Sequence, residues 1–587
     1  MKKSAILLLA VPFLLSGCIH TKKIDPPKPP EEHVYESTRS AKIWLSRGYS
    51  APITLYKMKG MSEDVPYVNV LKAYNNLYVL LASSYDPYNS NSYKLSASTS
   101  GDKVVLASSY STFTFDVEED TMTVSNINKA MLLLTHDSEK MIVASGLETS
   151  YVKVNDDLTQ NINSNTSVTF NMGDYDIDLI KENKTVYMPM ATFNDLFMAI
   201  NGIAFAYNGK DLYLTNSFNT SQSGIGAEDL ELQYFEDSPW AGKQRSQELA
   251  TFTYNEFCFA LDKLYGLKDF RNITSFDSLF ETRGWKDDLL DTNPDVYELA
   301  MIDFVGSYLS EGHTRYTKIS SFNYGTDYGL QIQDAQYANE RYVSLLEARA
   351  DLMADREELN QGIGLSICDN TAIIRFDQFV KAAADTSGIN PDYYSYAALH
   401  ESDTPLFFKK AFHDISQYSG IDNIVIDITC NGGGMLDSLP WLEAFMTDDP
   451  FLTIRNSLTG QITDAHYKVD LNQDGVFNEN DTYKNQYKFF LLTSSFSFSC
   501  GNAFPTIVKK GAMATIIGEK SGGGACAVGA LTTASGTVLR MSCTLQMGSL
   551  NDQNEFVINE NGIEVDHELD RIYFYQNSSL KGFVNSL

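Results

Sequence analysis

The sequence is poor in cysteine and in positive charge, and both shortages exclude classes of protein. Only 7 cysteines occur in 587 residues, and no two of them form a C-x-x-C pair, so neither a zinc site nor a small disulfide-rich scaffold is indicated. Individual disulfides stay compatible with a compartment outside the cytoplasm. Lys and Arg number 45 against 75 Asp and Glu, a formal net charge of -30. Nucleic acid is therefore excluded as a partner, because its phosphates require basic side chains.

Long apolar runs are lacking except at the N-terminus. Two lysines precede an apolar run from Ala5 to Leu15, which ends in Leu15-Ser16-Gly17-Cys18. This order is that of an export signal, and the run is shorter than the ~20 residues of a resident transmembrane helix. The tetrapeptide resembles the lipobox at which bacteria cleave the chain and lipidate the cysteine. We therefore expect residues 1–18 to be a signal peptide and Cys18 to anchor the protein by lipid to a membrane of the bacterial cell envelope, outside the cytoplasm. The alternative is an ordinary secretion signal with an incidental cysteine.

The rest of the chain is long enough for several domains, each with its own core. Residues 19–35 contain four prolines among Lys and Glu, a composition typical of an extended tether. Residues 36–225 alternate short β-rich runs with Asn, Asp, Ser and Gly turns, which predicts a mostly-β, α+β module. Two runs in it, VPYVNVLKAYN and TVYMPMATFNDLF, each read as a strand leading into a helix. They resemble the N-terminal domain of copper amine oxidases, and this resemblance implies no copper.

Residues 240–320 have the spacing of helices. Apolar residues recur every 3 to 5 positions from Leu249 until Gly266 ends the run, and Asn293 with Pro294 forms a cap and first turn for a second helix that ends at Gly312. His313 is therefore expected just beyond a helix end. Farther on, a polar helix over 328–360 precedes short apolar strands separated by helical segments, which predicts an α/β sheet. The strands are TAIIRF (371–376), NIVIDI (423–428), KFFLLT (488–493) and MATIIG (513–518).

Ser499 stands where the third of these strands turns into a helix. Such a turn exposes a side chain and leaves free backbone N–H groups that can stabilise an oxyanion. A serine at this place can also be a plain helix cap. Two glycine-rich loops follow neighbouring strands, Thr429 to Gly434 and Gly518 to Gly524, and they allow main-chain amides to approach a ligand. Their alternative role is that of flexible turns. Neither carries a nucleotide-binding fingerprint.

Three segments together resemble motifs of the tail-specific, or C-terminal processing, serine protease family. DITCNGGG is similar to the family's D-L-R-x-N-x-G-G loop, SFSCGNAF to its S-A-S-A-S-E nucleophile turn, and ATIIGEKSGGG to its V-V-G-E-x-T-x-G segment. They occur in the family's order, and NGIEVDHEL resembles its G-I-x-P-D signature. The resemblance covers residues 240–575. It implies that catalysis needs no cofactor, that Ser499 is the nucleophile, and that the amide of Cys500 with one from Gly432 or Gly433 forms the oxyanion hole.

The resulting fold class is multidomain: an N-terminal mostly-β α+β module, a helical lead-in over 240–320 and a C-terminal α/β, crotonase/ClpP-like protease core over 321–580. The expected substrate is a peptide or protein. No peptide-binding PDZ segment is indicated between His313 and Thr371.

The general base departs from the best-known branch of the family. That branch uses a lysine after the G-E-x-T segment, but Gly524 falls at its position and Lys520 lies four residues too early. Another branch, the tricorn-type and nisin-resistance-type peptidases, takes a histidine from the helical region, and Glu311-Gly312-His313-Thr314 resembles that segment. We therefore expect His313 to be the base, because a histidine of pKa ~6.5 accepts a proton near neutral pH. An isolated histidine can also be a surface or core residue. His567 is the fallback.

The third catalytic position has several candidates. By resemblance to the tricorn-type arrangement, Glu560 would lie near the site and orient a partner, with Glu519 and Asp566 as competitors. The expected reaction is acyl transfer. Ser499 attacks a peptide carbonyl, His313 carries the proton, and water releases the acyl-enzyme.

A separate polar motif lies between the first glycine loop and the nucleophile strand. Its spacing matches positions 1, 3, 5, 6, 9 and 12 of a calcium loop, and its residues are Asp470, Asn472, Asp474, Gly475, Asn478 and Asp481. Oxygen ligands at these offsets predict one structural calcium ion. The alternative is a polar hairpin loop, since Asn, Asp and Gly also form turns.

Two other functions compete with the peptidase. One is a catalytically inactive, protease-fold lipoprotein that binds envelope components, which the missing lysine favours. The other is an acyl-CoA enzyme of crotonase-like architecture, which the export signal disfavours because that cofactor is cytoplasmic.

Overall fold

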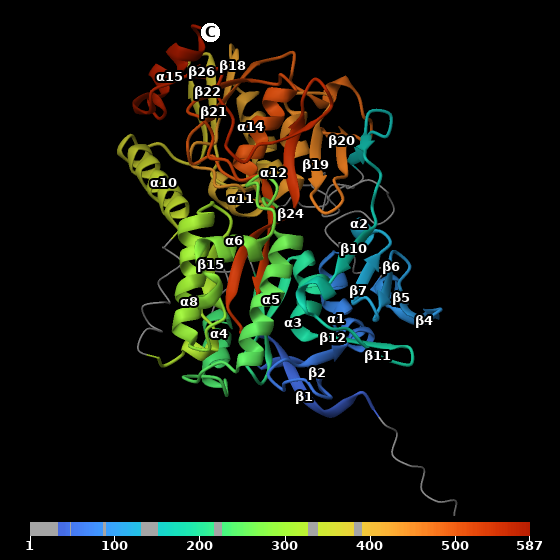
Figure 1. Ribbon diagram of the computed structural model, residues 1–587. Helices are drawn as coiled ribbons and strands as arrows, with labels where there is room; N and C mark the ends of the chain where they lie inside the picture. The colour runs from blue at the N-terminus through green and yellow to red at the C-terminus, as the bar shows by residue number, and fades with distance from the viewer. Residues whose placement is uncertain are drawn as a thin grey trace, which may run out of the picture.

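The computed structural model describes residues 33–46, 48–85, 90–130, 151–216, 226–326, 339–380 and 390–587 (Figure 1). The expected signal peptide, Cys18 and nearly all of the tether lie outside these residues. Among the described residues, no helix is both long and apolar enough to cross a bilayer. The six cysteines after Cys18 are all free thiols, so none of them forms a disulfide.

The N-terminal module contains two sheets. The first has the strand order β11-β12-β3-β2-β1-β14-β13. Its strands are β1 (Tyr35–Ser46), β2 (Tyr49–Met58), β3 (Tyr67–Asn69), β11 (Ile180–Glu182), β12 (Thr185–Pro189), β13 (Ile203–Tyr207) and β14 (Leu212–Asn216). As predicted, β3 leads into helix α1 (Val70–Tyr85) and β12 into α3 (Met190–Phe193). The two strands pair with each other, so the similar segments lie side by side.

The second sheet has the order β10-β7-β6-β5-β4. Its strands are β4 (Ser96–Ser100), β5 (Lys103–Ala107), β6 (Thr112–Asp116), β7 (Thr121–Val124) and β10 (Val168–Asn171). Helix α2 (Ile127–Ala130) follows β7 in the chain. Val104, Leu106, Phe113 and Phe115 alternate with less buried neighbours and enter one core. This period of two is that of a sheet with one buried face.

The helical lead-in follows the predicted pattern closely. Its helices are α4 (Gly226–Glu236), α5 (Gln247–Leu264), α6 (Phe276–Arg283), α7 (Lys286–Leu289) and α8 (Pro294–Ile302). Asn293 caps α8 by accepting a hydrogen bond from the amide of Asp295. The prediction that this helix ends at Gly312 was wrong by a few residues. It continues as a π-helical turn, η5 (Asp303–Leu309), and ends at Ser310, whose left-handed backbone (φ 35°) breaks the helical path.

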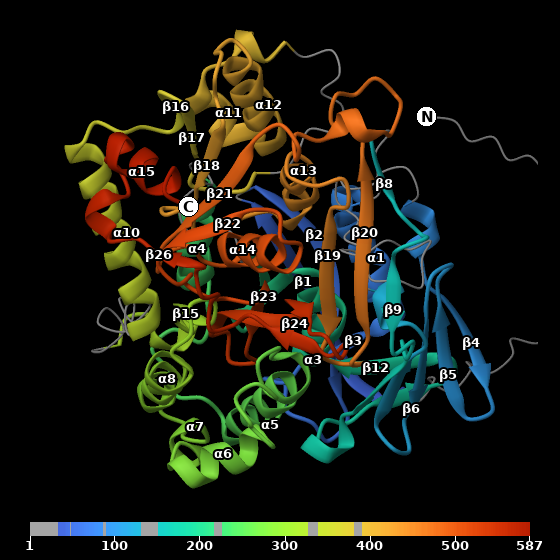
Figure 2. The ribbon, with the colours of Figure 1, turned by 90° about the horizontal axis from the view of Figure 1, so that it is seen from above.

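An eight-stranded sheet joins the lead-in, the C-terminal region and two strands from the N-terminal module. Its main order is β15-β24-β19-β20-β8, and β23, β25 and β9 pair alongside. The strands are β8 (Val152–Val154), β9 (Gln160–Ile162), β15 (Arg315–Lys318), β19 (Phe451–Asn456), β20 (Ile462–Val469), β23 (Cys526–Thr532), β24 (Val538–Leu550) and β25 (Phe556–Ile558). Figure 2 shows β8 and β9 beside β20. The sequence did not indicate that strands of the N-terminal module pair with a strand of the C-terminal region.

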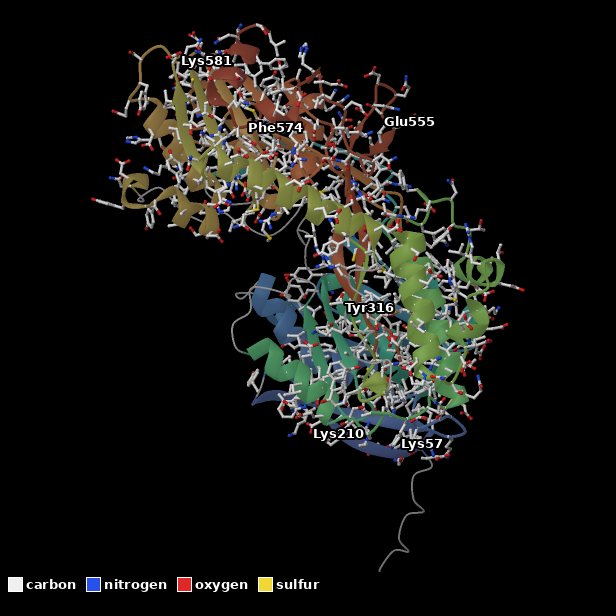
Figure 3. The ribbon with its side chains drawn as sticks, turned by 90° about the vertical axis from the view of Figure 1, so that its left-hand side faces the viewer. Lys57, Lys210, Tyr316, Glu555, Phe574 and Lys581 are labelled. Carbon is white, nitrogen blue, oxygen red and sulfur yellow. The ribbon has the colours of Figure 1, made fainter. Side chains whose placement is uncertain are left out.

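The predicted α/β sheet is six-stranded, with the order β16-β17-β18-β21-β22-β26, and is parallel from β17 onward. Its strands are β16 (Gly364–Cys368), β17 (Thr371–Arg375), β18 (Asn423–Asp427), β21 (Lys488–Thr493), β22 (Thr515–Gly518) and β26 (His567–Glu568). Figure 3 shows this region, marked by Phe574 and Lys581, at the opposite end of the molecule from Lys57 and Lys210.

Helices cover both faces of this sheet (Figure 2). One layer contains α11 (Tyr396–Ser402), α12 (Thr404–Ile415), α13 (Leu439–Ala444) and α14 (Cys500–Lys510), and the other contains α10 (Glu340–Glu358) and α15 (Asn577–Val584). Side chains of one strand alternate between two cores: Ile424 and Ile426 face the first layer, and Val425 faces the second. Burial on both faces explains why these strands are continuously apolar in sequence. The protein is thus multidomain, with mixed sheets and helices.

Candidate active site

Three loops meet at the carboxyl ends of the parallel strands β18, β21 and β22. The amide of Phe498 donates to the carbonyl of Asn431 (3.1 Å), and the amide of Ser499 donates to the carbonyl of Gly523 (2.9 Å). The predicted nucleophile turn is therefore held on one side by the first glycine loop and on the other by the second. Ligands in open α/β sheets bind at this edge of the strands.

Ser499 has a strained backbone. Its φ is 57° and its ψ is -121°, a sparsely populated region for a residue with a Cβ. It occupies the N-cap of α14, yet its side chain makes no capping hydrogen bond. The explanation that this serine is a plain helix cap is therefore wrong. Strain of this kind costs about 1–3 kcal/mol and is found mainly where function requires it.

The glycine loop after β18 lies directly against this turn. A Cβ on Gly433 would lie 2.7 Å from Cβ of Ser499 and 2.9 Å from the amide nitrogen of Cys500, so only glycine allows this approach. As the first residue of α14, Cys500 has no acceptor within its helix, and its amide is available for an oxyanion. The amides of Gly432 and Gly433 already donate to the Asp377 carbonyl (3.3 Å) and to Asn431 Oδ1 (2.9 Å). Both glycine amides expected as the second oxyanion donor are therefore already hydrogen-bonded within the protein.

His313 lies at the same place, although it comes from a distant segment. It is 1% exposed, its ring packs edge-on against that of Phe498 with centroids 4.6 Å apart, and a Cβ on Gly524 would lie 3.2 Å from its Cε1. Neither ring nitrogen has a hydrogen-bond partner among the described residues. Burial lowers the pKa of His313 well below its usual value, and the charges of Arg540 and Arg315 lower it further. The ring is thus neutral at pH 7, the form that accepts a proton.

Two glutamates flank the histidine. Glu311, buried at 4% exposure, accepts from the backbone amide of His313 (2.7 Å) and from Ser542 Oγ (2.8 Å). Glu560 accepts from the amide of Ala525 (2.7 Å). Burial and then the charge of Glu311 raise the pKa of Glu560 to about 8, so the two carboxyl groups lie close enough to repel. Glu560 makes no hydrogen bond to His313 here.

The competing residues lie elsewhere. Lys520 forms an exposed ion pair with Glu564 (2.7 Å), and Asp566 pairs with Lys509 (3.1 Å). Glu519 accepts a long bond from the amide of Ser495 (3.4 Å), and His567 is exposed on β26. Among the described residues, no hydrogen bond or ion pair joins any of these four side chains to Ser499 or His313.

The predicted calcium loop has a compact internal geometry. Asp470, which is fully buried, accepts from the amides of Asp474 (3.1 Å) and Gly475 (2.8 Å). Asp481 accepts from the amides of Asn472 (3.3 Å) and Asn478 (2.9 Å). Burial raises the pKa of Asp481, and the charge of Asp470 adds to the rise. The first and last acidic residues of the motif therefore both accept hydrogen bonds from amides of this one loop.

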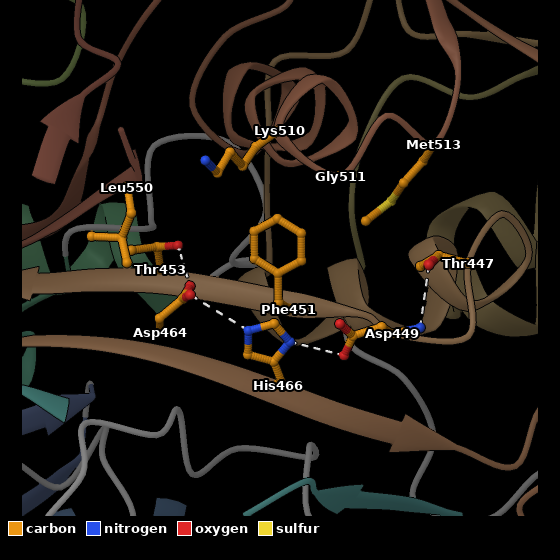
Figure 4. A pocket seen from close by; sticks show the side chains of 10 residues that line it. All are labelled: Thr447, Asp449, Phe451, Thr453, Asp464, His466, Lys510, Gly511, Met513 and Leu550. Atoms are coloured by element: carbon orange, nitrogen blue, oxygen red, sulfur yellow. Dashed lines mark hydrogen bonds and ion pairs between the residues drawn. The ribbon is translucent and has the colours of Figure 1, made fainter. Parts of the chain in front are cut away.

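A cavity of about 260 Å³ lies apart from these residues, at the far end of α14 (Figure 4). It is lined by Lys510 and by His466, which stands between Asp449 (2.8 Å) and Asp464 (3.4 Å). Because α14 has 11 residues, the cavity is roughly 15 Å from Ser499. It is not the site that the sequence predicts.

Four residues beside the histidine were not predicted as site residues: Glu311, Phe498, Arg315 and Arg540. Glu311 and Arg315 flank His313 in the chain, and that proximity was the only signal available for them. Arg540 carried none, because pairing of β24 with β15 alone brings it there.

Comparison with known proteins finds a family domain in the C-terminal part of the chain. Residues 370–569 match the model of Peptidase family S41. No curated protein sequence matches the chain. Among solved structures, the chain is similar to mature CPAF (14% identity, 57% of this chain and 96% of that chain, TM-score 0.37). It is also similar to a lipoprotein from Streptococcus agalactiae (9%, 56% and 95%, 0.32) and to the tricorn protease (11%, 89% and 45%, 0.31). All three TM-scores are below 0.5, so the assignment rests on the family model.

The protein is therefore a serine-type peptidase. More specifically, residues 370–569 carry a domain of Peptidase family S41, the family of tail-specific proteases.

Proposed function

We propose that this S41 peptidase, with a crotonase/ClpP-like core, hydrolyses peptide bonds with Ser499 as nucleophile and His313 as general base. The observation that carries the proposal is the strained, non-capping backbone of Ser499, which lies against Gly433. The ring of the preceding residue, Phe498, packs against the buried, neutral His313. Exposed Lys520, paired with Glu564, does not serve as base.

The steps of the reaction follow from these positions. Ser499 Oγ attacks the peptide carbonyl carbon while His313 takes its proton, and the amide of Cys500 stabilises the oxyanion. His313 then returns the proton to the leaving amine as the C–N bond breaks. Water, activated by the same histidine, hydrolyses the ester. Glu311 positions His313 by accepting its backbone amide, and Glu560 supports the loop that carries Gly524 through Ala525.

A covalent probe tests the nucleophile directly. The purified protein should react with a fluorophosphonate at one residue, and mass spectrometry should locate the adduct on Ser499. Ser499→Ala and His313→Ala should abolish labelling and casein hydrolysis, whereas Lys520→Ala should not. Ser495→Ala is the matched control, because Ser495 is an exposed serine of the same loop. Equal turnover by Ser499→Ala would contradict Ser499 as the nucleophile, and a wild type that neither labels nor hydrolyses casein would favour the inactive binding lipoprotein.

We also propose that the protein is anchored to the bacterial envelope through lipid on Cys18. The lipobox-like tetrapeptide supports this. Mass spectrometry of the N-terminal peptide should show a diacylglyceryl cysteine, and Cys18→Ala should move the protein from the detergent phase to the aqueous phase. A wild-type chain that retains its first residues would contradict the proposal.

The loop over residues 470–481 is proposed to hold one structural calcium ion. Amides of this loop orient the carboxylates of Asp470 and Asp481. The charge of Asp470 acts on Asp481, and a divalent cation would neutralise this repulsion. Calcium should raise Tm, EDTA should reverse the rise, and equal magnesium should have less effect. Asp470→Asn should abolish the response, whereas Asp157→Asn, on an exposed residue outside the loop, should keep it. A calcium response unchanged by Asp470→Asn would contradict the assignment.

A further inference from the structure

The cavity at the far end of α14 has charged side chains of opposite sign on its two sides. Residues of β19, β20 and the end of α14 line it. Lys510, the last residue of α14, lies on one side of the ring of Phe451, and Asp449 lies on the other (Figure 4). The volume of about 260 Å³ is below the about 300–1,000 Å³ of pockets for drug-sized ligands. The cavity therefore suits a small molecule.

Both of these charges are available to a ligand. Lys510 is exposed, and it forms no ion pair or side-chain hydrogen bond with any described residue. The side chain of Asp449 is 42% exposed. Its Oδ1 accepts from Nδ1 of His466 (2.8 Å), whereas its Oδ2 has no donor in the described part of the chain. One oxygen of Asp449 is thus oriented by His466, and the other is left for a ligand.

The second carboxylate of the cavity is already engaged. Oδ1 of Asp464 accepts from Thr453 Oγ1 (2.6 Å), and its Oδ2 faces Nε2 of His466 (3.4 Å). Its side chain is only 14% exposed. The cavity therefore offers a ligand one carboxylate oxygen and one ammonium group, and it is not a general acidic surface that any cation would neutralise.

Between the two charges, the cavity is apolar and open. The ring of Phe451 stacks on that of His466 with centroids 5.5 Å apart, and Met513 and Leu550 lie beside it. A Cβ on Gly511 would lie 2.6 Å from Cε of Met513 and 3.3 Å from Cε1 of Phe451. The φ of Gly511 is -81°, which every residue adopts, so the backbone does not require glycine here. The glycine instead leaves room above the aromatic ring.

We propose that this cavity binds a short zwitterionic peptide of dipeptide size, with its terminal ammonium on Asp449 and its terminal carboxylate on Lys510. Hydrogen bonds between charged groups are among the strongest in proteins, so they fix the orientation of the ligand. Phe451 and its apolar neighbours receive an apolar side chain. A dipeptide extends over roughly 7 Å, enough to pass from one side of the ring to the other. This site lies apart from Ser499, and the inference does not depend on the proposed catalysis.

Calorimetric titration tests the site with four ligands built on Gly-Leu. They are the free dipeptide, N-acetyl-Gly-Leu, Gly-Leu-amide and the doubly blocked peptide. The Ser499→Ala protein is used, so that no ligand is cleaved by the proposed nucleophile. The free dipeptide should bind about 10- to 100-fold more tightly than either singly blocked form, as expected when one charge-assisted contact is lost. Equal affinity of all four ligands, or no binding of the free dipeptide, would overturn the inference.

Variants assign each end of the ligand to its side chain. In Lys510→Gln, the free dipeptide and Gly-Leu-amide should bind within about two-fold of each other, while the preference over N-acetyl-Gly-Leu remains. Asp449→Asn should give the reverse pattern. The matched controls are Lys509→Gln and Asp448→Asn, because these two neighbours form ion pairs outside the cavity. Both controls should keep the full preference for the free dipeptide.

The remaining outcomes separate the site from a structural role and from the proposed chemistry. A preference that survives both Lys510→Gln and Asp449→Asn would place the ligand elsewhere and overturn the inference. An equal loss on all four ligands, with a Tm below that of the controls, would indicate a structural role and overturn it as well. If the preference changes as expected but the wild type shows no serine-dependent hydrolysis, the dipeptide site is retained and only the peptidase mechanism fails.

Discussion

The ring of Phe498 packs edge-on against His313, with centroids 4.6 Å apart. Phe498 immediately precedes the proposed nucleophile, so the base and the nucleophile turn are in direct contact through this ring. Gly524 lies against both rings: a Cβ there would be 2.6 Å from Cε2 of Phe498 and 3.2 Å from Cε1 of His313. The position of the histidine thus depends on the absence of a side chain in the second glycine loop.

Gly524→Ala should therefore reduce activity strongly while the protein still folds. Its Cβ would displace one of the rings, and its φ of +84° adds backbone strain. A displacement of about 1 Å near a reacting group costs about 100-fold in rate, and we expect a loss of this size in kcat/KM on casein. Gly362→Ala is the control, because Gly362 has open space around its Cβ position and no positive φ. Full activity of Gly524→Ala would contradict the arrangement.

The backbone conformation of Ser499 should lower the stability of the folded protein. Ser499→Gly relieves its left-handed backbone (φ 57°) and should raise the free energy of unfolding by about 1 kcal/mol relative to Ser499→Ala, which keeps the strain. Both variants lack the hydroxyl, so the comparison isolates the backbone. Urea unfolding of the C-terminal region, followed by fluorescence, measures the difference. Equal stability of the two variants would show that the strain is absent.

The acid limb of activity should lie below the ordinary histidine range. Burial and the charges of Arg540 and Arg315 lower the pKa of His313, so the base remains neutral as pH falls below ~6.5, and kcat/KM should decline only at lower pH. A pH profile on a neutral peptide measures this limb. His466→Gln should not move it. Burial lowers the pKa of His466, but hydrogen bonds to Asp464 and Asp449 outweigh this effect and raise the pKa. An acid limb above pH ~6.5 that disappears in His466→Gln would therefore belong to His466 and contradict the assignment to His313.

The contact between the N-terminal module and α5 should weaken as pH rises. Asp195 and Glu256 are 0% and 1% exposed, and burial raises the pKa of both, that of Glu256 to about 6. The unfolded chain loses these protons above about pH 4, whereas the folded protein retains them. Their contribution to stability is thus complete at low pH and is lost as pH rises through about 6.

Asp195→Asn removes one of these titrating groups. It should raise Tm at pH 8 by about 2 °C or more relative to its effect at pH 5. Thermal unfolding at the two pH values measures this, and Asp174→Asn, on an exposed residue outside the pair, should change Tm equally at both. A larger gain at pH 5 would reverse the sign and contradict the assignment.

Most secondary structure was accessible from the sequence, because local patterns carry it. Continuous apolar runs predicted β17, β18, β21 and β22, and these strands lie where expected because both of their faces are buried. The family motifs located Ser499 and the glycine loops, since residues of one motif are neighbours in the chain. The path of residues 303–310 was not predicted, because a π-helical turn depends on packing around it rather than on apolar spacing.

By itself, the sequence determined the apolar strands β17, β18, β21 and β22, the glycine-rich loops after β18 and β22, and the resemblance to a family of serine proteases. Only the tertiary structure decided which distant residues meet: β8 and β9 on β20, His313 against Phe498, and Arg315 opposite Arg540. The physical reason is that strand pairing and register depend on burial of surfaces from the whole molecule. The apolar pattern of a sequence specifies which face of a strand is buried. Tertiary packing decides which strand pairs with it and which side chain lies opposite.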